Sequence, residues 1–142
     1  MIAVFLAGIL ALATPVPGPA PSCPHSDISV TALQIKVIKG SAKTATADRL
    51  LITGVFTNVG EQSQQPHIAQ HAELLRDGVV VASQPLPALA ARVAYPLQFR
   101  IFRDTSQRTD PIGVLVRYVL DDKRRPVRNN CSPTNDSLQK TF

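Results

Sequence analysis

A stretch of strict alternation is the feature that most limits the fold of this chain. Between residues 93 and 102, the apolar side chains of Val93, Tyr95, Leu97, Phe99 and Ile101 alternate with those of Ala94, Pro96, Gln98, Arg100 and Phe102. Successive side chains of a β-strand point to opposite faces, so a period of two predicts a strand with one face in the core and the other mostly in water.

Further β-branched and apolar runs lie between turn-forming residues. They predict strands over residues 28–37, 50–59, 68–76, 79–83, 112–120 and within 127–142. The alternation slips by one residue near Thr31 and Ala32, as a β-bulge would cause. Asp77-Gly78 between two apolar runs predicts a type I′ hairpin turn. Seven short strands joined by turns predict an all-β fold, an antiparallel β-sandwich.

The N-terminus has the character of an export signal. Residues 1–13 form an uncharged apolar run that ends in Ala11-Leu12-Ala13 and is too short to span a bilayer. We expect a signal peptide over 1–13, a Pro-rich leader over 14–26 and one domain over 27–142, in the periplasm or outside the cell. Because no Lys or Arg precedes the apolar run, an uncleaved anchor is the alternative.

Two cysteines flank the predicted domain. Cys23 and Cys131 are 131 − 23 = 108 positions apart, and a sandwich with neighbouring first and last strands can bring them together. We predict a disulfide, which an exported protein can keep. The competing interpretation is a pair of reactive thiols, or one nucleophilic cysteine near His25, although no C-x-x-C spacing is present.

The chain is basic, with a formal net charge of +5. Its densest cationic cluster consists of Lys123, Arg124, Arg125 and Arg128, and further candidates for a basic surface are Arg92, Arg100, Arg103 and Arg108. The cluster predicts a patch for an anionic partner, a protein or a surface polymer, and the alternative is a solvated loop that discourages edge pairing. Nucleic acid is not expected after export, and a membrane is expected only as a surface or through an uncleaved N-terminal segment.

The sequence offers few candidate catalytic or metal-binding residues. His67 and His71, with Glu73, are weak metal candidates, because residues four apart on a strand lie roughly 13 Å apart and one ion needs several ligands close together. The sequence contains no recognisable catalytic motif, so we predict no enzyme, no metal and no cofactor. The aromatic residues Phe56, Phe99 and Phe102 are expected mostly in the core, which leaves few platforms for a sugar.

Several turn motifs resemble those of one family. Thr57-Asn58-Val59-Gly60 after a strand, Leu74-Leu75-Arg76-Asp77-Gly78, and residues 86–91 before the alternating strand are similar to the CARDB domain, a cell-adhesion-related module of bacteria. The resemblance covers Asp27 to about Asp136 and implies a seven-stranded antiparallel immunoglobulin-like β-sandwich. The family often has an acidic, Asn-rich segment near its end. Here residues 127–136 keep the asparagines but have basic or neutral residues where glutamates are usual, which argues against carrying over a cation-binding role.

These observations together favour binding over catalysis. We expect an exported, non-catalytic adhesion-type module that recognises a protein or an anionic envelope component. The alternatives are a structural accessory subunit or spacer of an envelope assembly, and a small hydrolase without a recognisable motif.

Overall fold

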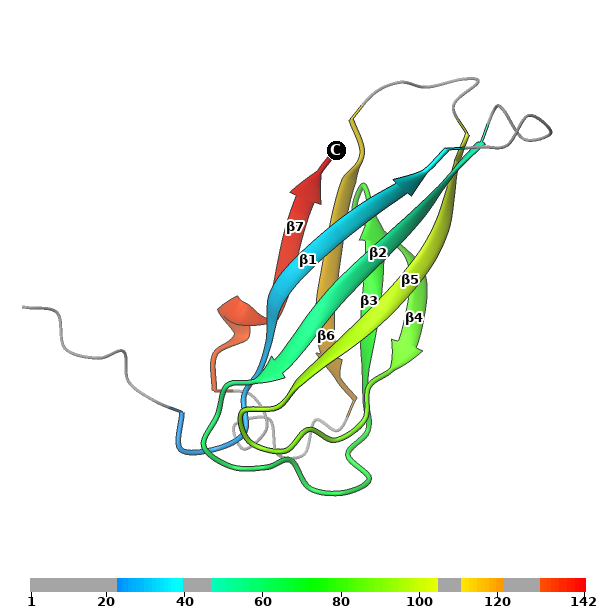
Figure 1. Cartoon of the computed structure of the whole chain (residues 1–142). Helices are drawn as coiled ribbons and strands as arrows, with labels where there is room; N and C mark the ends of the chain where they lie inside the picture. The colour runs from blue at the N-terminus through cyan, green and yellow to red at the C-terminus, as the bar shows by residue number, and fades with distance from the viewer. Residues whose placement is uncertain (1–22, 40–46, 105–110, 122–130) are drawn as a thin grey trace, which may run out of the picture.

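The structure, a computed structural model, describes residues 23–39, 47–104, 111–121 and 131–142. Seven strands form two antiparallel sheets that pack face to face (Figure 1). The strands are β1 (Ile28–Ile38), β2 (Ala47–Asn58), β3 (Gln70–Arg76), β4 (Val79–Pro85), β5 (Ala94–Asp104), β6 (Gly113–Leu120) and β7 (Ser137–Thr141). The all-β sandwich predicted from the sequence is therefore confirmed, and the predicted signal peptide lies outside the described residues.

Each layer has a simple strand order. One sheet has the order β1-β2-β5 and the other β4-β3-β6-β7. The predicted bulge is present, because the β1–β2 register shifts between Val30 and Ala32. The predicted hairpin joins β3 to β4, and its two turn residues, Asp77 and Gly78, have φ angles of 49° and 83°. Positive φ at both central positions is the mark of a type I′ turn.

The core fills the space between the sheets with alternate side chains of every central strand. Its residues are Ile28, Val30, Leu50, Ile52, Phe56, Ala72, Leu74, Leu86, Leu89, Leu97, Phe99, Ile112, Val114, Val116 and Tyr118. Close contact between the layers depends on Gly54, where an added Cβ would lie 2.8 Å from Cγ1 of Val116. Phe56 and Phe99 are fully buried as expected, whereas Phe102 is 67% exposed. That expectation for Phe102 is wrong because the β5 register turns this residue to the outer face.

A disulfide joins the N-terminal segment to the segment before β7 at one end of the sandwich. Cys23 and Cys131 form a disulfide with a Cα–Cα distance of 6.0 Å, as predicted. Beside it, the carboxylate of Asp27 accepts hydrogen bonds from the Asn135 side chain at 3.0 Å and from the Ser132 backbone at 3.4 Å. A short 3-10 helix, η1 (Pro133–Asn135), precedes β7, which contacts β1 across the two layers.

One buried side chain joins three segments at this same end. Asn58, at the end of β2, is fully buried. Its Oδ1 accepts hydrogen bonds from the backbone N–H groups of Asp27 at 3.0 Å and Gly60 at 3.1 Å, and its Nδ2 donates to the carbonyls of Gln62 at 2.8 Å and Leu89 at 3.1 Å. Asn58 thereby connects the N-terminal segment, the β2–β3 loop and the β4–β5 crossing.

Candidate functional site

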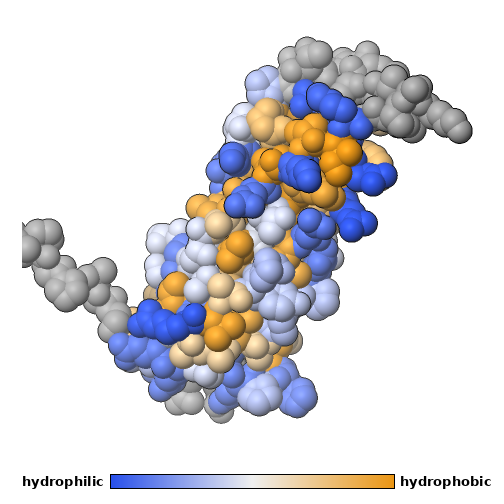
Figure 2. Space-filling model, in the orientation of Figure 1, coloured by the Kyte–Doolittle hydropathy of each residue, from blue (hydrophilic) through white to orange (hydrophobic). Residues whose placement is uncertain are grey.

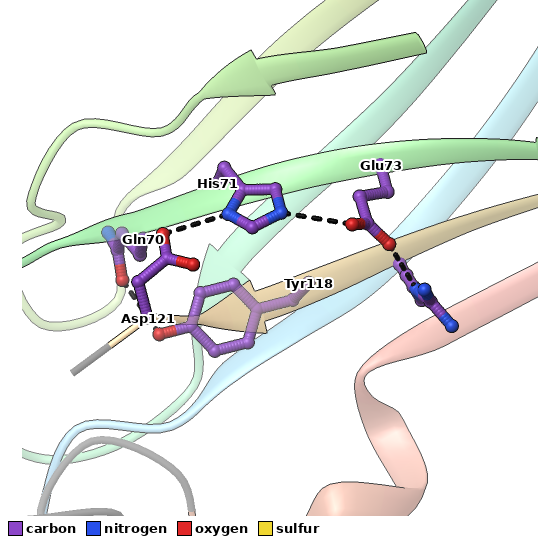
Figure 3. A network of polar contacts seen from close by, with 6 residues as sticks. Gln70, His71, Glu73, Tyr118 and Asp121 are labelled. Atoms are coloured by element: carbon purple, nitrogen blue, oxygen red, sulfur yellow. Dashed lines mark hydrogen bonds and ion pairs between the residues drawn. The ribbon is translucent and has the colours of Figure 1, made fainter. Parts of the chain in front are cut away.

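A chain of charged side chains crosses the outer face of the sheet that contains β3 and β6 (Figure 3). Nδ1 of His71 lies 2.8 Å from Asp121 Oδ2, and Nε2 of His71 lies 3.1 Å from Glu73 Oε1. The Nε group of Arg117 donates to the second oxygen of Glu73. Residues 71 and 73 share a face because they are two apart on β3, and Arg117 lies directly opposite Glu73 in the register.

The electrostatics of this network favour its charged form. The hydrogen bond to Asp121 raises the pKa of His71 above its ordinary value of 6.5, with a smaller contribution from Glu73. Burial raises the pKa of Glu73, but the hydrogen bonds from His71 and Arg117 outweigh it and lower the pKa overall. Both ring nitrogens of His71 face carboxylates, so both donate when the ring is an imidazolium. Neither nitrogen is then free to bind a metal.

The pH dependence of stability should report this network. The stabilisation that His71 contributes is fully present below pH 6.5, the pKa of the residue in the unfolded chain. It is lost as the pH rises through the raised pKa of His71 in the folded protein. We expect a loss of about 0.5 to 1 kcal/mol, the scale of partly exposed ion pairs. Urea unfolding at a series of pH values above 6.5 should show this loss in the wild type and in His67→Asn, but not in His71→Gln. An unchanged pH profile in His71→Gln would contradict it.

Behind the charged network lies a buried neutral cluster. The hydroxyl of Tyr118 donates to Oε1 of Gln70 at 2.7 Å, and Gln70 pairs with Gln64 through two amide hydrogen bonds of 2.7 and 2.9 Å. Gln64 also accepts a bond from the backbone of Leu89, at 2.9 Å. Burial raises the pKa of Tyr118, so the phenol stays protonated at neutral pH. These groups satisfy one another inside the protein, which indicates a structural role.

The predicted histidine pair does not share a strand face. His67 lies in the turn before β3 with a φ of 65°, whereas His71 lies within the strand. Within the described residues no group of three or more His, Cys, Asp or Glu side chains could hold a metal ion. The predicted cationic cluster, Lys123, Arg124, Arg125 and Arg128, lies outside the described residues, as does Arg108.

A second cationic surface, not predicted as such, lies on the outer face of the β1-β2-β5 sheet. Across the three strands, one outward-facing row consists of Ile38, Arg49 and Phe102. The adjacent outward-facing row consists of Lys36, Leu51 and Arg100. Three cations and three apolar side chains therefore alternate in both directions. We call these six residues the checkerboard face. Figure 2 shows apolar side chains bordered by hydrophilic ones near the upper end of this layer.

Five of the six side chains of the checkerboard face are exposed to solvent, and the sixth, Leu51, is half-buried. Lys36, Arg49 and Arg100 are exposed, and the guanidinium of Arg49 lies 5.9 Å from the ring centroid of Phe102. A cation over an aromatic face at this distance is attracted by the ring quadrupole. The next outward row, Gln34, Thr53 and Gln98, carries no charge. On the outer side of the described strands of this sheet, the one carboxylate is that of Asp104, in the row beyond Phe102.

A shallow hollow of about 370 Å³ borders the checkerboard face. Its lining includes Gln34, Lys36, Leu51, Thr53 and Gln98 from the outer face and Lys140 from β7. Two ammonium groups, two amides and a hydroxyl therefore gather around one opening. Such a set of donors is suited to an anion.

The other arginines proposed for a basic surface lie elsewhere. Arg103 points away from the checkerboard face, with its guanidinium 5.9 Å from the ring centroid of Phe142. Arg92 lies at the opposite end of β5, where it donates to the Val59 carbonyl at 2.7 Å. Arg100 alone among these candidates belongs to the checkerboard face.

Solved structures with the same arrangement of strands come from cell-surface and CARDB proteins. A domain described as part of a cell surface protein of Methanosarcina acetivorans matches with a TM-score of 0.58 and 15% identity, over 83% of this chain and 90% of that domain. The CARDB domain of a Pyrococcus furiosus protein, crystallised in complex with di-metal ions, matches with a TM-score of 0.54 and 10% identity, over 91% of this chain and 97% of that one. The chain has the CARDB fold. No protein-family model and no curated protein sequence matches it.

The CARDB likeness confirms the resemblance inferred from the turn motifs, and it concerns the fold. A solution structure of the same Pyrococcus domain agrees, with a TM-score of 0.52 at 9% identity. The metal ions belong to that protein, and the described residues of the present chain do not gather a ligand set for one. In the described part of the chain, no helix is long and apolar enough to cross a membrane.

Proposed function

We propose that this CARDB-like chain is an exported, non-catalytic adhesion-type module that binds an anionic component of the cell envelope. The observation that carries the proposal is the checkerboard face. Three exposed cations lie within two strand rows, and a protein surface gains little from gathering like charges unless a partner neutralises them. The apolar side chains between them add contact area for the same partner.

Two further features support an envelope location. The Cys23–Cys131 disulfide suits an oxidising compartment, where such bonds persist. One protein of the same fold is described as a cell surface protein. The buried amides of Gln64 and Gln70 bond to each other, and both ring nitrogens of His71 are paired with carboxylates. Recognition by an exposed surface is therefore better supported than chemistry in a pocket.

Two matched triple variants test the proposal by comparing the checkerboard face with the cationic cluster predicted from the sequence. In one variant Lys36, Arg49 and Arg100 become Gln, and in the other Lys123, Arg124 and Arg125 become Gln. Each lowers the formal net charge by three, from +5 to 5 − 3 = +2. Binding to immobilised dextran sulfate should fall roughly 100-fold in the first variant, because each cation near an anionic surface contributes about 1 kcal/mol. The second variant should bind nearly as the wild type does.

The controls separate binding from folding. Both variants should unfold at nearly the wild-type urea midpoint. For the first variant the reason is that Lys36, Arg49 and Arg100 are exposed, and substitutions of exposed side chains change stability little. Equal binding by the wild type and the first variant would contradict the proposal. Loss of binding in the second variant alone would assign the function to the 123–128 segment instead.

A further inference from the structure

We infer that the anionic component met by the checkerboard face is the surface of a lipid bilayer that contains anionic phospholipid. This inference rests on the proposed function and names its partner. Apolar and cationic side chains alternate on this face, so a partner that uses both kinds must present apolar groups and negative charges within a few ångströms of each other. The boundary between headgroups and acyl chains has both properties.

The apolar members are placed for shallow insertion. Phe102 is 67% exposed and Ile38 is 36% exposed, and both lie in the same outward row, with Arg49 between them. Two rows along a strand span roughly 7 Å, which matches the depth of about 5 to 10 Å to which interfacial segments bury their apolar side chains. Beyond these rows the face becomes neutral and polar at Gln34, Thr53 and Gln98.

The cationic members are placed to reach phosphates while their neighbours insert. Lys36, Arg49 and Arg100 have long aliphatic stems that can lie along apolar surface while the charged ends stay at headgroup level. The hollow beside Leu51, with Lys36 and Lys140 on its lining, offers donors for one headgroup phosphate. Both features suit a surface on which phosphates lie just above hydrocarbon.

A soluble polyanion would interact with the cations of this face but not with its apolar side chains. It would neutralise the cations but leave Phe102 and Ile38 in water, so it would gain nothing from their exposure. An acidic protein of ordinary interface size would need about 20 to 30 residues on each side, far more than these six. The alternation therefore favours the bilayer over either partner.

A single tryptophan can report insertion, because the natural chain contains none. We would compare Phe102→Trp with Val79→Trp, which places the indole on β4, where Val79 is 64% exposed. With phosphatidylglycerol vesicles, the Phe102→Trp emission should shift to the blue and be quenched by lipids brominated on the acyl chain. The Val79→Trp emission should change in neither respect. Both proteins carry the same residues 1–13, so any contribution of the apolar leader is common to them.

Affinity measurements distinguish the bilayer from the polyanion. Phe102→Ala should weaken partition into phosphatidylglycerol vesicles about tenfold, the effect of losing one buried aromatic side chain, and should leave dextran sulfate binding unchanged. Val79→Ala should change neither. If the protein binds dextran sulfate but Phe102→Trp shows no blue shift with vesicles, the lipid inference is overturned while the proposed function stands. If it binds neither, both are overturned.

Discussion

Replacing Cys131 with Ser is expected to lower the free energy of unfolding by about 4 to 5 kcal/mol, because the lost disulfide no longer restricts a long loop in the unfolded chain. The bond connects residues 108 positions apart, and in the folded protein it lies beside the contacts of Asp27 with η1. Urea unfolding of wild type and variant under identical conditions gives the difference from the two midpoints and slopes.

The double variant is the control for this disulfide. Cys23→Ser combined with Cys131→Ser removes the same single bond, so its loss of stability should equal that of the single variant rather than twice that value. It also removes the free thiol that could otherwise dimerise. A Cys131→Ser protein with the wild-type midpoint would show that the bond does not stabilise the domain.

Replacing Asn58 with Ala is expected to lower the free energy of unfolding by about 3 to 5 kcal/mol, because the buried backbone groups that hydrogen-bond to its side chain lose their partner. Its amide makes hydrogen bonds to the backbone groups of Asp27, Gly60, Gln62 and Leu89. An alanine side chain can neither donate nor accept a hydrogen bond, so all four of these bonds are lost. Thermal and urea unfolding should both show the loss.

The adjacent residue supplies a matched comparison for Asn58. The Thr57 hydroxyl lies 2.8 Å from that of Thr31 on the exposed side of the same sheet. Thr57→Ala should cost less than about 1 kcal/mol, since water can replace an exposed hydrogen bond. If both variants lose the same amount, the buried amide is not the element that joins the three segments.

Local patterns were sufficient to predict most of the fold. Alternation over 93–102 predicted β5, the phase slip near Thr31 predicted the bulge, and Asp77-Gly78 predicted the hairpin turn. These features depend on a few neighbouring residues and on backbone geometry that particular residue types favour. Their success reflects the agreement between local preference and the final structure.

The surfaces depend on register between strands, which no local pattern contains. Lys36, Leu51 and Arg100 become neighbours only after β1, β2 and β5 pair with a defined alignment. The same holds for His71 and Asp121, which are 50 positions apart in sequence. The outward alternation of 98, 100 and 102 did indicate that Arg100 and Phe102 share a face, which was the available clue to two of the six residues of the checkerboard face.

The salt dependence of polyanion binding tests the central claim most directly. The logarithm of the dextran sulfate binding constant should fall linearly with the logarithm of salt concentration, with roughly one unit of slope for each cation in contact. We predict that the Lys36, Arg49 and Arg100 triple variant has a slope shallower by about two to three units, since these contacts release the counterions. The Lys123, Arg124 and Arg125 variant should keep the wild-type slope. Identical slopes for wild type and the first variant would contradict the assignment of binding to the checkerboard face.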